Sequence, residues 1–238
     1  MEDKIMKKYE ITNEAKVVYG ITLHRIRAVV SFGAIIKGEL GGWIETEDNL
    51  SQEDNAWVYG NAKVYGNAEV CGNAKVYGDA EVYGNAKVCG NAEVYGNAEV
   101  CGDAWVYGDA LVYGDALVYG NANVCGDAKV YGDAEVYGNA KVYGNAEVCG
   151  NAKVYGDADV YGNAKVYGDA DYIVFKNWWS SGRYFTWTRS NNKWRVGCFF
   201  GTGAELIVKA YEDSEKSGRE YERVVKYVES IIENENKL

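Results

Sequence analysis

Val58-Tyr-Gly-Asn-Ala-Lys-Val64-Tyr-Gly-Asn-Ala-Glu-Val70 opens a run in which six residues, Val-Tyr/Cys-Gly-Asn/Asp-Ala-x, recur without a break. Valine returns at every sixth position from Val58 to Val166, nineteen times in all, with no insertion. A short fixed period indicates one structural unit stacked on itself. A repeat this regular also leaves no loops in which an active site could be built.

Each hexad has the pattern of a short strand followed by a corner. Ala62 and Val64 lie two positions apart across the junction between hexads, so both point to the same side of the strand. Lys63 and Tyr65 point to the other side. Gly and the Asn or Asp after it tolerate left-handed backbone better than other residues, and they follow in every hexad. We therefore expect three strands to close a triangular coil, with Val and Ala inside.

An aliphatic residue followed four positions later by a small one is the pattern of hexapeptide-repeat proteins, and residues 58–166 resemble that family. The resemblance implies a left-handed parallel β-helix. The predicted fold is mainly β: a left-handed parallel β-helix of about six coils, each about 4.8 Å high, with an N-terminal β cap and a small C-terminal α+β domain. The expected domains are residues 1–49, 50–171 and 172–238.

The segment before the repeat is predicted to cap the β-helix. Residues 9–12 and 16–27 alternate like strands, the second as a hairpin, and residues 40–45 lead into the first coil. Ile44 and Leu50 already keep the six-residue spacing. The end of a β-helix exposes unpaired strand edges and an open core, so it needs such a cap.

Residues eighteen positions apart should stack, which makes the outward columns readable from the sequence. The x positions mostly alternate in charge, as cross-strand pairs prefer. Three successive x positions are apolar, and we predict that this belt is an oligomer or partner surface: Trp105, Leu111 and Leu117. The second outward column is Tyr or Cys, and such aromatic ladders favour a role in structure or oligomerisation over flat-ligand binding.

Five of the six cysteines replace Tyr in that column, at spacings that disfavour a zinc site. Cys71 and Cys89 are expected on adjacent coils, near enough for a bridge. No signal peptide or apolar transmembrane run is visible, however, so a reducing bacterial cytoplasm is the expected location. We therefore expect free thiols, no metal, no cofactor and no membrane association.

The sequence favours a non-enzyme. Acyltransferases of the hexapeptide-repeat family use a histidine base, and its zinc carbonic anhydrases need several histidine ligands. This chain has one histidine, His24, which precedes the repeat in an alternating strand pattern beside basic residues. It is predicted to be a surface residue, which leaves no base, nucleophile pair or metal cluster for catalysis.

The composition changes completely after the repeat. Residues 172–204 contain ten aromatic and five basic residues and no acid. A hairpin turning at Asn191-Asn192 and two helices are predicted, with capping boxes at residues 202–205 and 217–220. Aromatics interleaved with Arg and Lys suit a flat anionic ligand, although the aromatics could instead form the core beneath the helices. The predicted ligand-binding residues are Lys176, Trp178, Arg183, Trp187, Arg189, Lys193, Trp194 and Arg195.

The whole chain resembles hexapeptide-repeat proteins of bacteriophages and prophages, often labelled polymer-forming, through residues 40–45, the repeat and residues 194–202. This resemblance implies a phage accessory protein. We expect a non-enzymatic binding protein whose β-helix oligomerises and whose C-terminal domain captures a host-defence nucleotide signal or a host protein. One alternative is a purely structural, self-assembling protein.

The second alternative is an acidic mimic of nucleic acid that inhibits a host DNA- or RNA-binding enzyme. Residues 50–171 hold eighteen acidic and seven basic residues, so most of the chain's acidity lies in the repeat. Lysines interrupt the rows of carboxylates, which argues against mimicry. Direct binding of nucleic acid by so acidic a prism is not expected.

Overall fold

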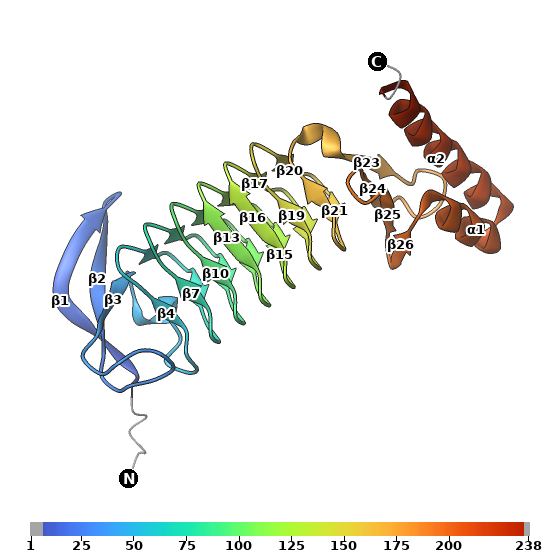
Figure 1. The fold of residues 1–238 in the computed structure, drawn as a ribbon. Helices are drawn as coiled ribbons and strands as arrows, with labels where there is room; N and C mark the ends of the chain where they lie inside the picture. Colours follow the sequence, from blue (N-terminus) through green and yellow to red (C-terminus); the bar gives the residue numbers. More distant parts are fainter. Residues whose placement is uncertain (1–6, 236–238) are drawn as a thin grey trace, which may run out of the picture.

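The computed structural model describes residues 7–235 as a three-sided rod with a β-hairpin at one end and two helices at the other (Figure 1). The strands of the repeat pair in parallel, each with the strand one coil away, so the rod is a parallel β-solenoid. We call its sides face 1 (β3-β5-β8-β11-β14-β17-β20), face 2 (β4-β7-β10-β13-β16-β19-β22) and face 3 (β6-β9-β12-β15-β18-β21). The predicted fold class is confirmed.

The strands of the repeat are short because each hexad contributes one corner and one face. Their bounds are β4 (Trp57–Val58), β5 (Lys63–Val64), β6 (Glu69–Val70), β7 (Lys75–Val76), β8 (Glu81–Val82), β9 (Lys87–Val88), β10 (Glu93–Val94), β11 (Glu99–Val100), β12 (Trp105–Val106), β13 (Leu111–Gly114), β14 (Leu117–Val118), β15 (Asn123–Val124), β16 (Lys129–Gly132), β17 (Glu135–Val136), β18 (Lys141–Val142), β19 (Glu147–Val148), β20 (Lys153–Val154), β21 (Asp159–Val160) and β22 (Lys165–Val166).

The interior of the rod is built from the Val and Ala of every hexad, as predicted. From Ala62 to Val166 these side chains are buried and form one continuous hydrophobic core. Removing a valine side chain from water contributes about 1.5–3 kcal/mol. The solenoid is therefore held together by many equal, small contributions spread along its length.

The corners differ in one respect from the prediction. The glycines adopt the left-handed backbone, with φ of 73° at Gly84 for example, whereas the Asn and Asp residues that follow them do not. Their side chains instead bond from coil to coil: the Asn73 amide donates to Asn91 at 3.0 Å, and Asn91 donates to Asp109 at 2.8 Å. A row of these bonds ends at an aspartate, because an ionised carboxylate accepts hydrogen bonds but cannot donate one to the next coil.

The solenoid has about seven coils, one more than the roughly six expected from the hexads. Face 2 is a 7-stranded sheet, and β3 (Leu40–Ile44) pairs in parallel with β5 on face 1. Leu50 adds a bridge to Val70 on face 3. Residues before the strict repeat therefore form an additional coil, because they keep the inward apolar positions and lack only the Gly-Asn/Asp corner.

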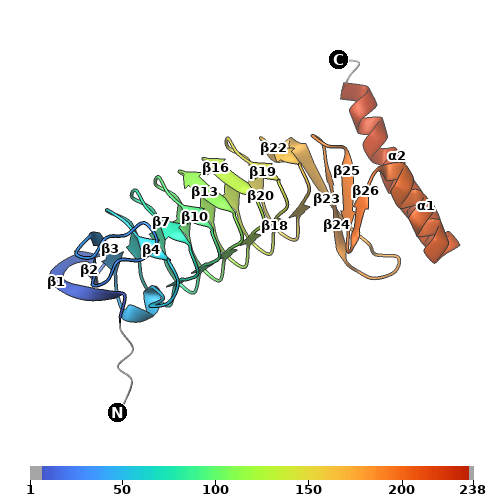
Figure 2. The same cartoon turned by 60° about the horizontal axis from the view of Figure 1, so that its bottom comes forward.

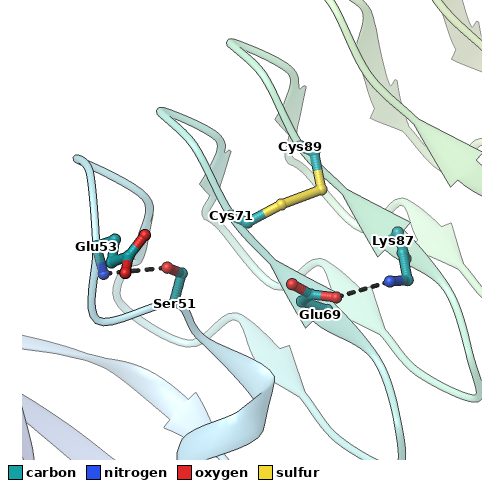
Figure 3. Close-up of a disulfide and its surroundings, with 6 residues drawn as sticks. All are labelled: Ser51, Glu53, Glu69, Cys71, Lys87 and Cys89. Atoms are coloured by element: carbon teal, nitrogen blue, oxygen red, sulfur yellow. Dashed lines mark hydrogen bonds and ion pairs between the residues drawn. A yellow bond between two sulfur atoms is a disulfide. The ribbon is translucent and has the colours of Figure 1, made fainter.

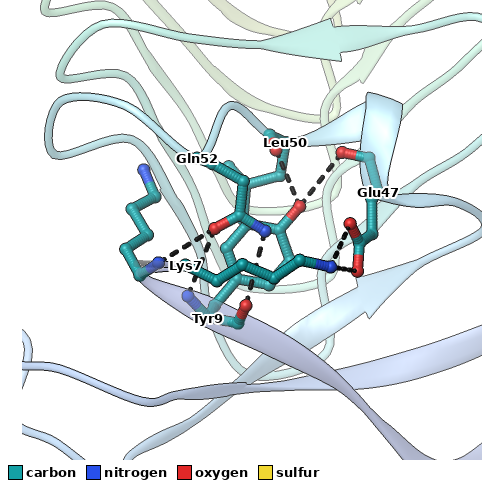
Figure 4. Close-up of polar contacts among 6 residues, drawn as sticks. Lys7, Tyr9, Glu47, Leu50 and Gln52 are labelled. Atoms are coloured by element: carbon teal, nitrogen blue, oxygen red, sulfur yellow. Dashed lines mark hydrogen bonds and ion pairs between the residues drawn. The ribbon is translucent and has the colours of Figure 1, made fainter. Parts of the chain in front are cut away.

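The N-terminal end of the rod is closed by hydrogen-bond donors. β1 (Tyr9–Val18) and β2 (Ile21–Ala28) form an antiparallel hairpin that extends face 1, and η1 (Glu47–Asn49) follows β3. The Lys8 ammonium donates to the carbonyl of Ala56 at 3.0 Å, and the Tyr9 hydroxyl donates to that of Leu50 at 2.7 Å. Figure 4 shows Tyr9 and Gln52 in this cap.

The opposite end is closed by hydrogen-bond acceptors. Within the repeat, the first N–H of each strand donates to an alanine carbonyl of the next coil, as Lys141 does to Ala158. The last coil has no next coil, and side-chain oxygens take the place of those carbonyls. These bonds run from Lys153 to Asp169 (3.1 Å), from Asp159 to Thr186 (2.9 Å) and from Lys165 to Ser190 (2.6 Å).

The C-terminal domain begins after η2 (Asp169–Asp171) with a 4-stranded antiparallel sheet. One face of the sheet lies on the last coil, and helices α1 (Gly203–Asp213) and α2 (Glu215–Glu235) cover the other (Figure 2). The predicted hairpin turn is confirmed, with Asn192 in the left-handed region. The strands are β23 (Tyr172–Lys176), β24 (Tyr184–Thr188), β25 (Lys193–Val196) and β26 (Phe199–Gly201).

Of the two predicted capping boxes, the first is confirmed and the second is wrong. Thr202 accepts a hydrogen bond from the N–H of Glu205 and caps α1. Ser217 lies inside α2, which begins two residues earlier at Glu215. The side chain of Ser214 accepts the N–H of Ser217 at 3.1 Å, so Ser214, the single residue between the two helices, acts as the cap.

The expectation of free thiols is wrong for one pair of cysteines. Cys71 and Cys89 form a disulfide across two coils of face 3, with their Cα atoms 4.7 Å apart (Figure 3). Stacking of equivalent positions brings the two thiols together without distortion of the ladder. Cys101, Cys125, Cys149 and Cys198 are free.

Candidate functional site

The structure divides the predicted aromatic and basic cluster between the two faces of the C-terminal sheet. Trp187 and Trp194 face the helices and are 1% and 2% exposed, in a core with Phe185. Sequence reasoning left open whether the aromatics bind a ligand or form the core. Their burial shows that these two tryptophans belong to the core, and neither indole is accessible to a ligand.

Three of the predicted basic residues are engaged by other parts of the chain. Arg189 forms an ion pair with Glu235 at 2.5 Å, and Lys193 lies 4.0 Å from Glu205. Arg195 points toward the solenoid, where its Nε donates to the Tyr143 hydroxyl at 2.7 Å. The three cations therefore do not converge on one anion site.

The remaining predicted residues are Lys176, the last residue of β23, and Trp178 and Arg183 on the loop between β23 and β24. Trp178 is 72% exposed, and Lys176 and Arg183 are exposed as well. Asn177 holds the loop in place. Its side-chain amide donates to the Tyr221 hydroxyl at 2.9 Å, and its backbone carbonyl accepts the N–H of Gly182 at 2.8 Å. We call residues 176–184 the outer loop.

A cavity of about 340 Å³ opens beside the outer loop, between the sheet and α1. Arg183 and Lys209 bring positive charge to its wall, and Asp213 brings negative charge. Lys209 also pairs with Glu212 at 2.7 Å. The exposed Cys198 also lines this cavity. This mixture of charges does not favour a small anion over other ligands.

The residues of the predicted apolar belt lie at the outward positions that the eighteen-residue spacing predicts. Trp105, Leu111 and Leu117 stand on β12, β13 and β14, which belong to three different faces. Trp105 is 50% exposed, whereas the two leucines are half-buried. One flat partner therefore meets at most two of the three residues.

The tyrosine columns form stacked ladders that are tied to the charges beside them. On face 2, the rings of Tyr77, Tyr95 and Tyr113 stack at centroid distances of 4.7 and 4.8 Å. The hydroxyl of Tyr77 donates at 2.8 Å to Glu93 on the next coil, which also pairs with Lys75 at 2.8 Å. On faces 1 and 2 such runs of stacked rings and ion pairs are each interrupted by one cysteine, Cys101 on face 1 and Cys149 on face 2.

Face 3 departs from this arrangement and contains a cleft of about 460 Å³. Its lining residues are Tyr107, Asn123, Cys125, Lys141, Tyr143 and Arg195. A hydrogen bond with the Cys125 thiol, together with burial, raises the pKa of Tyr107 to about 12. Burial raises the pKa of Tyr143 to about 12 as well, while Arg195 acts against the shift. Both phenols are therefore neutral at physiological pH.

Sequence reasoning missed this cleft, although the columns contain the signal. In the coil of β15, Cys125 stands where most hexads have Tyr, and Asn123 stands where most have a charged side chain. Both substitutions are to smaller residues, two positions apart in the same coil. The contribution of Arg195 was not visible, because the sequence does not show which face of the C-terminal sheet meets the solenoid.

His24 lies on β2 in the N-terminal cap and is half-buried, rather than on an open surface as predicted. Across residues 7–235, no group of three or more His, Cys, Asp or Glu side chains is arranged to hold a metal ion. Over the same described range, no helix is long and apolar enough to cross a membrane.

One segment of the repeat matches a family model. Residues 104–120, which include the Leu111 and Leu117 coil, match the model described as YdcK Beta solenoid repeat. The description names a structural repeat and no reaction. A comparison with curated proteins gave no match. The stacked parallel strands make the chain a β-solenoid repeat protein, and the matched segment supports that fold.

Proposed function

We propose that this protein is a non-enzymatic scaffold whose rigid solenoid holds the C-terminal domain and whose outer loop captures a host protein. The observation that carries the proposal is the exposed group of Trp178, Lys176 and Arg183 on a loop fixed by Asn177. Tryptophan, tyrosine and arginine are the residues that most often dominate the energetics of protein interfaces. A preformed loop also lowers the entropy cost of binding.

The attachment of the domain supports a scaffold. Thr186 and Ser190 bond directly to backbone N–H groups of the last coil, and Tyr172 donates to the carbonyl of Lys153 at 2.8 Å. The C-terminal sheet is thus an integral end of the rod rather than a tethered module. On the resemblance to phage proteins, we place the proposed activity in the cytoplasm of an infected bacterium.

A nucleotide signal is less well supported as the partner of this domain. Arg189 and Lys193 pair with carboxylates, and Arg195 lies on the solenoid side of the sheet. Phosphate recognition by arginine relies on several convergent hydrogen bonds. The exposed residues of the outer loop offer fewer convergent hydrogen-bond donors, so a protein surface is the better-supported partner.

The two other hypotheses also have less support. End-to-end assembly would require bare coil edges, and here both ends are occupied by side chains of the same chain. Lateral association through the belt at Trp105 is still compatible with the structure. Mimicry of nucleic acid would require uncompensated anions, but Glu81, Glu93 and Glu135 each pair with a lysine.

The proposal is tested by affinity capture from a bacterial lysate, using the full-length protein and the double variant Trp178→Ala/Arg183→Ala. Tyr227→Ala, which removes an aromatic ring that is 57% exposed on α2 of the same domain, is the matched control. We expect one host protein to be retained by wild type and by the control and to be lost with the double variant. Retention by all three proteins, or by none, would reject the outer loop as the capture surface.

A further inference from the structure

The regular tyrosine ladder defines how much space one ring occupies. On face 2, successive rings from Tyr77 to Tyr131 are 4.7, 4.8 and 4.9 Å apart and nearly parallel. Each ring fills the space between the ring on the coil before and the ring on the coil after. Offset stacking at this separation is the favourable arrangement for aromatic groups.

On face 3 one ring of such a ladder is missing. Tyr107 and Tyr143 occupy equivalent positions two coils apart, and Cys125 stands between them. Two coils correspond to about 10 Å along the rod, which is the spacing of two rings with room for a third. Asn123, the outward neighbour of Cys125, is small as well, so the gap is wider than a single side chain. The cleft of about 460 Å³ lies at this gap.

The gap is bordered by positive charge. Lys141 stands on the coil after Asn123, and its ammonium forms no carboxylate ion pair within 4.0 Å among the residues of the described chain. Arg195 reaches the same place from β25, with its guanidinium 4.8 Å from the centroid of the Tyr161 ring. Its bond to the Tyr143 hydroxyl fixes the guanidinium at the Tyr143 side of the cleft. Asp159, one coil further along, is the acid that these cations face.

Two other single cysteines interrupt tyrosine columns, and each has a glutamate beside it. Cys101 lies between Tyr83 and Tyr119 on face 1, where Glu99 accepts a hydrogen bond from Tyr83 at 2.9 Å. Cys149 on face 2 is buried, with Glu147 two positions before it. A carboxylate at the gap repels an anion, whereas the Asn123 amide at the Cys125 gap can donate or accept hydrogen bonds.

We propose that the cleft at Cys125 binds a planar aromatic molecule that bears an anionic group. The ring takes the place of the missing tyrosine between Tyr107 and Tyr143, and the anion lies against Lys141 and Arg195. The volume is within the range of small-ligand sites, and stacking between rings with a nearby cation is a common way to hold flat anions. The site is formed by the solenoid and β25, so it does not depend on the partner of the outer loop.

The decisive variant fills the gap with the residue that the repeat itself uses. Cys125→Tyr restores the usual hexad and is compatible with the fold, because stacked tyrosines occupy the equivalent place on face 2. Cys101→Tyr makes the same chemical change at the gap on face 1 and is the matched control. Cys125→Ala keeps the gap open and removes the thiol, and Lys141→Gln removes one cation.

Binding is measured by isothermal titration calorimetry with four probes: adenosine 5′-monophosphate, 1-naphthoate, adenosine and inorganic phosphate. We expect wild type to bind at least one of the first two probes about tenfold or more tightly than adenosine or phosphate, since ring and charge act together. Binding of the first probe alone indicates a nucleotide, and binding of the second alone indicates an aromatic acid.

Cys125→Tyr should abolish this binding, while Cys101→Tyr and Cys125→Ala should retain it. Lys141→Gln should weaken binding of the anionic probe and leave the affinity for adenosine unchanged. The proposal is overturned if wild type binds neither anionic probe, or if Cys125→Tyr, shown by circular dichroism to be folded, binds as tightly as wild type.

Discussion

The stacking of glycines at the corners predicts that one substitution has very different costs at two positions of the same column. Gly102 and Gly156 both follow strands of face 1, and both have left-handed backbone, with φ of 68° and 66°. A Cβ at position 102 would lie 2.9 Å from the backbone nitrogen of Gly120 on the next coil. A Cβ at position 156 would meet nothing within 4 Å, because no coil of the repeat follows there.

Gly156→Ala should therefore cost only the left-handed backbone strain, about 1–2 kcal/mol of unfolding free energy. Gly102→Ala carries the same strain and must also push two coils apart at one corner. Overpacking of this kind adds about 1–3 kcal/mol, and it stretches the 2.8 Å hydrogen bond from the Asp103 N–H to the Gly120 carbonyl. We expect a total of about 2–5 kcal/mol for Gly102→Ala.

Urea unfolding followed by circular dichroism, with wild type and both variants under identical conditions, measures the difference. If the two variants lose the same stability, the backbone strain alone explains the glycines and the close approach of the coils contributes nothing. A larger loss for Gly156→Ala would contradict the argument altogether.

Three further predictions concern the end caps, the disulfide and the charge ladder. Thr186→Val leaves the partly buried N–H of Asp159 without its acceptor and should cost about 1–3 kcal/mol in urea unfolding, whereas Thr186→Ser should cost less because it retains the hydroxyl. Cys71→Ser/Cys89→Ser should lower stability by about 3 kcal/mol, and the difference from wild type should vanish when a reductant opens the Cys71–Cys89 bridge. The ion pair with Lys153, together with the hydrogen bond from Tyr119, lowers the pKa of Glu135. Its stabilising contribution is present above the unfolded-state pKa and lost as the pH falls through the folded-state pKa, so Glu135→Gln should be less stable than wild type near pH 7 and equal to it in strong acid.

The solenoid was largely predictable because one residue pattern determines both local conformation and stacking. Val and Ala positions, the outward columns and the apolar belt at Trp105 follow from a period of six and a coil of three strands. The extra coil before the repeat was less visible, since Leu40–Ile44 keeps the apolar spacing without the glycine corner. The role of the corner Asn residues was not expected. Their tolerance of left-handed backbone already accounted for their place at the corners, so their use as hydrogen-bond donors between coils was not considered.

The candidate sites were less predictable, for a physical reason. Alternation along β24 and β25 shows that side chains divide between two faces, but not that one face meets the helices and the other meets the solenoid. The partner of Arg189 is Glu235, 46 residues away in the sequence, and the partner of Arg195 is Tyr143, 52 residues away. Such long-range pairings cannot be read from composition, so the predicted cluster combined residues that the fold separates.

The two end caps also have a consequence for the length of the molecule. The donors at one end and the acceptors at the other bond to the backbone edge of a coil, and every coil of the repeat presents the same edge. These backbone bonds of the two caps therefore do not depend on how many coils lie between them. Deleting or duplicating one interior coil of eighteen residues, such as 103–120 with its equivalent corners, changes the reach of the rod by about 4.8 Å and leaves the orientation of the C-terminal domain unchanged. The length of the rod can therefore change in steps of one coil without a change in the function of either end.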